Sequence, residues 1–452
     1  MGRVRPGGPC VGSSYPIRAL VSLWKETVSA KLSRSVAEAR RENRVFMETG
    51  SVLARVPVKP ELLRWACERV GKPESALAEK KQFAALPEWL SGAKAPTLKQ
   101  LEDFAKATRT PFGFFFLAEP PVEKIPIPDY RTVGSERVQH PSPDLLDTIY
   151  LCQQRQDWFR QNALVLGEAP LDFVASATVQ SNVVATAARI RQAVGLDLDA
   201  RAEAKRWEDA LRMMIDAADQ AGILVMISGI VGHNSHRPLD TAEFRGFALC
   251  DDAPHLAPLI FINGTDTKSG QMFTLAHELA HLWLGESGIS DVTPASSLPQ
   301  RATVERWCNA VAAEMLVPLS GFRQAYSRRA ELKPEMQRLS RQYKVSTLVV
   351  LRRMLDAGGL TREAFQAAFD AELKRLRAEL ARRKEASSGG DYYATTSVRV
   401  SERFARAVLS STWEGRSTFT EAFRLLGCRN VKTLESLGDR LGMTAYLRGG
   451  AV

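Results

Sequence analysis

The sequence lacks any long apolar stretch, since no run of about 18 apolar residues occurs in it. A transmembrane helix is therefore not expected, and Met1–Pro6 lack the apolar core of a signal peptide. The six cysteines are scattered and form no CxxC pair. This spacing excludes a disulfide framework and fits a reducing compartment. We therefore expect a cytoplasmic protein with no membrane contact.

No convincing internal repeat is present, and no strong charge bias extends along the chain. The formal charge is +10, but half of it lies in residues 1–50, where nine Lys and Arg face four Glu. Charge alone is thus a weak argument for nucleic-acid binding. We expect residues 1–50 to be a disordered basic extension. Met47 lies just before the first well-patterned segment and is an alternative start of translation.

The composition is that of an ordinary globular protein, with 45% hydrophobic and 25% charged residues over 452 positions. This length exceeds a single core and indicates two or three domains. The pattern predicts an α+β, mainly helical chain in which a small sheet directly precedes a buried helix. The expected segments are a helical bundle at 55–118, a proline-rich linker at 119–142, a larger domain at 143–360 and a helical C-terminal region at 361–452. Within these segments, helices are expected at Val174–Val194 and Pro73–Lys81, among others.

The residues with the clearest chemistry form an HExxH motif, His277-Glu278-Leu279-Ala280-His281. On a helix, two histidines four positions apart lie on one face and can bind one zinc ion at about 2.0–2.1 Å. Glu278 is rotated by roughly 100° from His277 and is placed to act as general base on a water molecule. The surrounding residues are apolar nearly all round, which predicts burial and makes unpaired histidines there costly.

A catalytic zinc needs a third protein ligand and an open position for water. Glu305 is the predicted third ligand, and Asn309, four residues further on, is predicted to orient a histidine from the same face. Glu286 and Glu314 remain alternative third ligands.

Together, the HExxH helix, Glu305-x-x-x-Asn309-Ala-Val-Ala-Ala-Glu314-Met-Leu-Val-Pro318 and the strands near Arg245 and Ile260 resemble the ImmA/IrrE family of zinc metallopeptidases. The resemblance covers roughly residues 196–360. It implies a zincin-like fold, zinc bound by His277, His281 and Glu305, and Glu278 as the catalytic glutamate. Members of the family cleave DNA-bound repressors or provoke their cleavage. A strand containing Arg245, Gly246 and Phe247 is expected to align an extended substrate by edge pairing.

Residues 61–117 resemble a helix-turn-helix domain of the Xre/Cro type, through Leu77-Ala78, Trp89-x-x-Gly92 and Pro96-Thr97-Leu98-x-x-Leu101. The resemblance implies a third helix in the DNA major groove. The stretch Phe83–Leu90 is unusually apolar for that role. The predicted DNA contacts suit phosphates better than bases; they are Lys80, Lys81, Gln82, Lys94 and Lys99. The alternatives are a docking surface for a protein and a purely structural bundle.

The sequence as a whole therefore predicts a zinc endopeptidase coupled to a DNA-binding regulator. Its substrate is expected to be a repressor or a toxin-like partner protein in a stress, mobile-element or toxin-antitoxin switch, and a dimer is possible. The competing hypothesis is a non-catalytic antitoxin or transcriptional regulator with a structural zinc site.

Overall fold

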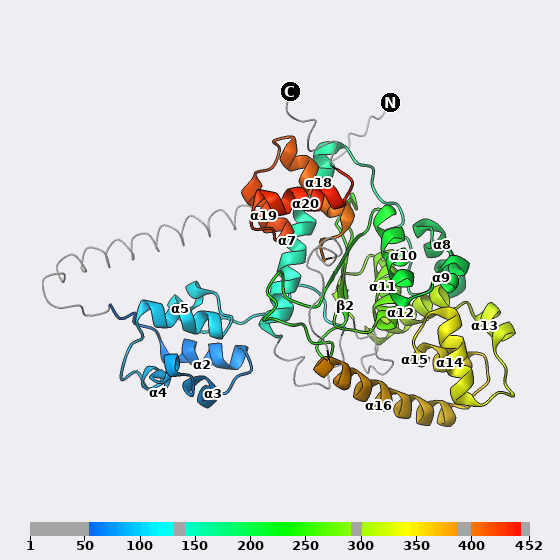
Figure 1. Cartoon of the computed structure of the whole chain (residues 1–452), viewed down its shortest axis with the longest axis horizontal. Helices are drawn as coiled ribbons and strands as arrows, with labels where there is room; N and C mark the ends of the chain where they lie inside the picture. The colour runs from blue at the N-terminus through cyan, green and yellow to red at the C-terminus, as the bar shows by residue number, and fades with distance from the viewer. Residues whose placement is uncertain (1–53, 131–140, 291–300, 387–398, 444–452) are drawn as a thin grey trace, which may run out of the picture. The chain divides into compact units, whose positions relative to one another are not determined.

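The computed structural model describes residues 54–130, 141–290, 301–386 and 399–443 (Figure 1). The basic extension 1–50 and Met47 lie outside these residues. The described chain divides near Pro120 into two compact units, except that Glu68–Gly71 group with the second. In the part that the structure describes, no helix is long and apolar enough to cross a membrane.

The first unit is a small all-helical bundle around an aromatic core. Phe104 lies at its centre, with ring centroids 5.7 Å from Phe83, 6.2 Å from Trp89 and 5.8 Å from Phe115. Thr97 begins the last α-helix with a capping box, because its hydroxyl accepts from the Gln100 amide while the Gln100 side chain accepts from the Thr97 amide. The elements are α2 (Pro60–Arg69), α3 (Glu74–Ala78), η1 (Lys81–Phe83), α4 (Leu86–Leu90), α5 (Leu98–Ala107) and η2 (Phe112–Phe116).

The second unit is built on a four-stranded mixed sheet of order β1-β3-β2-β4. β1 (Leu224–Ser228) pairs in parallel with β3 (Leu259–Asn263), while β2 (Gly246–Leu249) pairs antiparallel with both β3 and the two-residue β4 (Gly288–Ile289). Every residue of these strands is buried. Because successive side chains point to opposite faces of a sheet, helices must cover both faces.

Alternation along β1 shows how the two faces are filled. Val225 and Ile227 enter one core, while Leu224 and Met226 enter the other. The first core takes helices that precede and follow the sheet in sequence. They are α8 (Val183–Val194), α10 (Trp207–Gln220), α11 (Lys268–Leu284), α12 (Arg301–Leu316), α13 (Leu319–Ala325), α14 (Leu332–Tyr343), α15 (Thr347–Asp356) and α16 (Arg362–Ala386). The short α9 (Leu198–Glu203) packs on α10 and α14.

The opposite face is covered by helices from the two ends of this unit. They are α7 (Pro143–Leu166), α18 (Glu402–Trp413), α19 (Phe419–Leu426) and α20 (Val431–Arg440), and Figure 1 shows them together on the side of the sheet away from α11. The C-terminal helices thus share a core with the sheet, and Phe365 of α16 belongs to the other core. The boundary predicted at residue 360 therefore does not separate two cores.

Two predicted helices were too long. The helix expected at Val174–Val194 begins only at Val183, because Asn182 caps it and a turn closed by Ser181 precedes it. The helix expected at Pro73–Lys81 ends at Ala78 and is followed by the separate turn η1. Local hydrogen bonds from short polar side chains compete with the helix at such positions.

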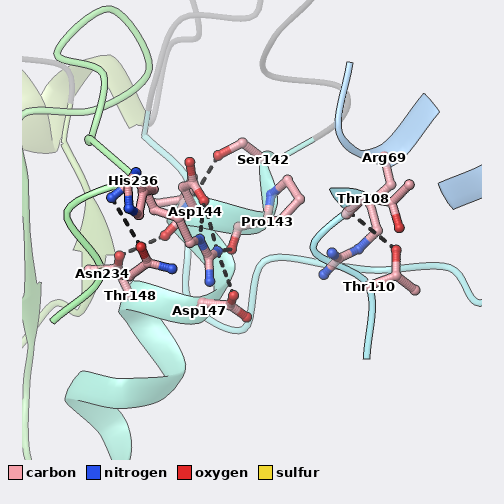
Figure 2. A network of polar contacts seen from close by, with 12 residues as sticks. Arg69, Thr108, Thr110, Ser142, Pro143, Asp144, Asp147, Thr148, Asn234 and His236 are labelled. Carbon is pink, nitrogen blue, oxygen red and sulfur yellow. Dashed lines mark hydrogen bonds and ion pairs between the residues drawn. The ribbon is translucent and has the colours of Figure 1, made fainter. Parts of the chain in front are cut away.

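The start of α7 fastens the loop that leads into β2 (Figure 2). The amide and hydroxyl of Ser142 both donate to Glu243, at 2.8 and 2.6 Å. The guanidinium of Arg237 bridges Asp144 and Asp147, at 2.7 and 2.6 Å. These bonds fix the chain immediately before β2, the strand that packs on the HExxH helix.

Candidate metal centre

The HExxH helix is α11, which is buried over nearly its whole circumference. The Thr267 hydroxyl caps its start by accepting from the Gly270 amide, and Gly285, with a φ of 73°, ends it in the left-handed conformation. Trp283 stacks on Phe173 with ring centroids 4.4 Å apart. The helix packs on β2 and β3 and along α12, so the sheet and α12 fix the direction of each histidine.

Packing of α12 against α11 brings Glu305 to the two histidines. Nε2 of His277 and Nε2 of His281 lie 3.1 Å apart, and the Glu305 carboxylate lies 3.3 Å from the first and 3.1 Å from the second. Both histidines are fully buried, and Glu305 is 2% exposed. Among the described residues, these three form the one group of His, Cys, Asp and Glu side chains close enough to hold a metal ion.

Asn309 orients His277, as its position one turn after Glu305 predicts. Its Oδ1 lies 3.1 Å from Nδ1 of His277. Because a carbonyl oxygen only accepts, Nδ1 carries the proton and Nε2 directs its lone pair at Glu305 and His281. The side chain of Asn309 therefore fixes the tautomer that a metal ligand requires.

Glu278 is also fully buried, on the same helix but outside the group of three. Its Oε2 accepts a hydrogen bond of 3.2 Å from the Ser290 hydroxyl, while its Oε1 has no hydrogen-bond partner. An acceptor without a donor in a dry core is costly unless a bound molecule supplies one. Oε1 is thus free to accept a proton.

The charges of the group are set by burial and by mutual contact. Burial opposes the ionisation of Glu305, but the two histidines lower its pKa to about 2. Burial, together with the charge on Glu305, raises the pKa of Glu278 to about 8, although His277 and the Ser290 hydroxyl act in the opposite direction. Burial lowers the pKa of His281, whereas contact with Glu305 outweighs burial at His277 and raises its pKa. A divalent cation here would favour the ionised form of Glu278.

The donor atoms fit zinc. Ligands held at about 2.0–2.1 Å in a tetrahedral arrangement lie roughly 3.3 Å from one another, and the three separations here are 3.1, 3.1 and 3.3 Å. Imidazole nitrogen with one carboxylate oxygen is also a ligand set typical of catalytic zinc. Three ligands leave one coordination position for water or substrate.

The two alternative third ligands lie elsewhere. Glu286 accepts a hydrogen bond of 2.8 Å from the Tyr130 hydroxyl. Glu314 pairs with Arg353 at 2.9 Å and accepts from the amide of Leu319 at the start of α13. The geometry therefore favours Glu305 over both.

The strand expected to align a substrate is not an edge strand. β2 lies between β3 and β4, and β4 pairs with Phe247 and Ala248. The expected free edge is absent at Phe247, because the two-residue strand β4, which follows the HExxH helix, pairs with it; Gly246 lies one residue beyond this pairing. Phe247 stacks on Phe261 in the opposite core, and Arg245 pairs with Asp266 at 2.8 Å. Gly246 does face α11, where a Cβ atom would lie 2.4 Å from the Thr274 methyl.

The predicted DNA contacts are all exposed or at the surface of the first unit. Lys80 directly precedes η1, and Lys81 and Gln82 lie in it. Lys94 pairs with Glu88 at 2.8 Å, and Lys99 pairs with Asp103 at 2.9 Å. The large apolar side chains of the stretch Phe83–Leu90 point into the core of the bundle, whereas Ala84 and Pro87 are exposed.

Sequence reasoning missed two residues beside the centre. Ser290 donates to Glu278, and the ring centroid of Tyr130 lies 5.5 Å from that of His281. Ser290 has no motif around it. Tyr130 lies within the proline-rich linker, and no periodicity there indicated contact with a helix about 150 residues later in the chain.

Comparison with known families agrees with this geometry. Residues 218–355 match the Peptidase_M78 model, the IrrE N-terminal-like domain. The matched segment contains the whole group of His277, His281 and Glu305, together with Glu278. The match indicates a metallopeptidase-like domain similar to a metal-dependent family, in agreement with the ImmA/IrrE resemblance. Residues 400–440 match a domain of unknown function (DUF8813). No curated protein matches the chain.

Proposed function

We propose that this protein is a zinc-dependent endopeptidase that cleaves a partner protein, and that its N-terminal unit is a DNA-binding regulator domain of the helix-turn-helix type. The observation that carries the proposal is the buried group of His277, His281 and Glu305, beside a glutamate with one unbonded oxygen. The match of residues 218–355 to the IrrE N-terminal-like domain supports it.

The side chains divide the chemistry between them. Zinc bound by the three ligands would supply Lewis acidity to a water molecule and a peptide carbonyl. Glu278 takes the proton of the attacking water at Oε1 and delivers it to the leaving amine. Ser290 holds the other carboxylate oxygen, and Asn309 keeps His277 in the ligating tautomer.

The decisive variant is Glu278→Gln, which keeps the shape of the side chain and removes the proton acceptor. We expect wild type to cleave the product of the neighbouring gene in co-expression and Glu278→Gln to leave it intact, while Glu208→Gln, an exposed carboxylate of α10, cleaves as wild type does. Equal integrity of the partner with wild type and Glu278→Gln would refute cleavage of that partner.

Metal content is tested separately from catalysis. We expect His277→Ala and Glu305→Ala to lose stoichiometric zinc in metal analysis, and Glu314→Ala to keep it. Zinc retained in Glu305→Ala would refute the assignment of Glu305 as the third ligand.

The substrate is proposed to be a repressor or a toxin-like partner, and the site of action the cytoplasm. This assignment rests on the resemblance to the ImmA/IrrE family and on the joined helical unit. A repressor gene beside this one favours proteolysis of that repressor.

One observation favours the competing function, a non-catalytic antitoxin or transcriptional regulator with structural zinc. His277, Glu278 and His281 have no solvent exposure, whereas a catalytic centre must admit its substrate. Zinc binding together with full integrity of every co-expressed partner would support this alternative.

A further inference from the structure

The segment Pro128–Tyr130 adds to the edge of the sheet beside the centre. It runs parallel to β4, where Asp129 lies opposite Ile289. The Tyr130 amide donates to the Ile289 carbonyl and the Ile289 amide donates to the Pro128 carbonyl, both at 2.9 Å. These are the backbone bonds by which an extended peptide adds to a sheet.

The side chain of Tyr130 holds this segment against the metal ligands. Its ring lies on the backbone of Gly288, where a Cβ atom would come within 2.2 Å of Cε2. The ring centroid is 5.5 Å from that of His281, and the hydroxyl donates to Glu286 at 2.8 Å. Tyr130 is itself 7% exposed. The ring therefore requires glycine at position 288 and covers one ligand directly.

The same edge adjoins the proton acceptor. Ile289 precedes Ser290, whose hydroxyl donates to Glu278. A peptide backbone bonded to Ile289 therefore passes one residue from the group that holds Glu278 and beside the ring of His281.

We propose that the β4 edge at Ile289 is the place where the backbone of an extended peptide substrate pairs, and that Pro128–Tyr130 occupy this place as an internal substitute. The inference rests on the proposed peptidase function and deepens it. The substrate class is an unfolded or locally extended chain, and binding requires the resident segment to leave.

The composition of the segment makes it replaceable. Pro128 has no amide hydrogen, so the segment cannot donate there, and Pro126, two residues earlier, cannot donate either. Its backbone pairs with β4 through the two bonds at Ile289. A substrate without proline at these positions can donate where the resident segment cannot. This additional bond offsets part of the advantage that the resident segment has from being tethered to the same chain.

The test compares zinc loss and cleavage in the full-length protein. Zinc-loaded Tyr130→Ala is expected to release zinc to EDTA about 10-fold faster than wild type, since one well-packed ring contact is removed from the ligands. Gly288→Ala, which displaces the ring but keeps the tyrosine, is expected to do the same. Both variants are expected to cleave denatured casein faster than wild type. Tyr150→Ala, an exposed tyrosine on α7, is the matched control and should match wild type in both assays.

The outcomes separate this inference from the proposed function. Unchanged zinc release in folded Tyr130→Ala and Gly288→Ala would overturn it. Faster zinc release with casein cleavage no faster than in wild type would also overturn it, because the substrate would then pair elsewhere. A protein that takes up no zinc contradicts the proposed function instead. In that case, hydrogen exchange at the Ile289 amide decides the pairing alone: faster exchange in Tyr130→Ala supports it and equal exchange refutes it.

Discussion

Replacing Asn309 by leucine removes the acceptor that orients His277, without touching any of the three ligands. The Oδ1 of Asn309 lies 3.1 Å from Nδ1 of His277, and the histidine is fully buried. Leucine keeps the branched outline of asparagine, and Asn309 is only half-buried, so the larger methyl groups can be accommodated between α12 and α11. The variant thus isolates the effect of one hydrogen bond on the centre.

Two independent arguments give the size of the effect. Loss of a partner that orients a ligating histidine typically weakens metal affinity by about 10- to 100-fold, which is about 1.4–2.7 kcal/mol. A buried donor left without an acceptor costs about 1–3 kcal/mol. The Nδ1–H of His277 would be such a donor, so both arguments predict the same loss of affinity in Asn309→Leu.

The assay is a zinc titration in competition with a chromophoric chelator, with circular dichroism to verify folding. Asn309→Asp is the matched control, because a carboxylate keeps the acceptor and is expected to bind zinc at least as tightly as wild type. Unchanged zinc affinity in folded Asn309→Leu would refute the reasoning, since the tautomer of His277 would then be fixed without Asn309.

Three further predictions concern charge, packing and DNA. Burial, with nearby arginines, lowers the pKa of His233 to about 4. Between about pH 6.5 and pH 4 only the unfolded chain binds a proton at His233, so the free energy of unfolding should fall by about 2–3 kcal/mol over this range. Thermal melts of His233→Gln should lack this part of the pH dependence. Gly246→Ala should lower the free energy of unfolding by about 1–3 kcal/mol in urea titrations, because its Cβ would lie 2.4 Å from the methyl group of Thr274 on α11. The control Gly321→Ala should be tolerated, since a Cβ atom there meets nothing within 4 Å. If the first unit binds DNA through phosphates, Lys80→Ala with Lys81→Ala should reduce the slope of log affinity against log salt by roughly 2, and an unchanged slope would contradict that contact.

The group of side chains that could hold a metal was predictable from sequence because helix geometry turns spacing into direction. His277 and His281 had to share a face of any helix, as had Glu305 and Asn309. The structure brings these two faces together. Asn309 contacts His277, and Glu305 contacts both His277 and His281. The main helices and three of the four strands were also predictable from their apolar patterns.

The rest depended on tertiary contacts that no local pattern records. β4 has two residues, too few for a period, yet it covers the edge that β2 was expected to offer. Tyr130 lies in a stretch whose prolines indicate only extended chain. The apolar run Leu224–Ile227 indicated that both faces of the sheet are covered, but an amphipathic helix carries no mark of which face it will cover. The place of α18–α20 opposite α11 could therefore not be predicted.

The ligand count bears on the choice between catalytic and structural zinc. Structural zinc sites are closed by four protein ligands, commonly with cysteine. The two cysteines nearest in packing are buried or half-buried, but Cys250 points its thiol at the His281 carbonyl, 3.9 Å away, and neither it nor Cys308 belongs to the metal-binding group of the described residues. A structural site would also have no use for a buried carboxylate with an unbonded oxygen beside it. Three ligands, an open coordination position and Glu278 are the parts that peptide hydrolysis would need. The burial that argues against catalysis is explained on the side of His281 by the ring of Tyr130. This tyrosine is held in place by its own backbone bond to Ile289, by the neighbouring bond from Ile289 to Pro128 and by the bond from its hydroxyl to Glu286.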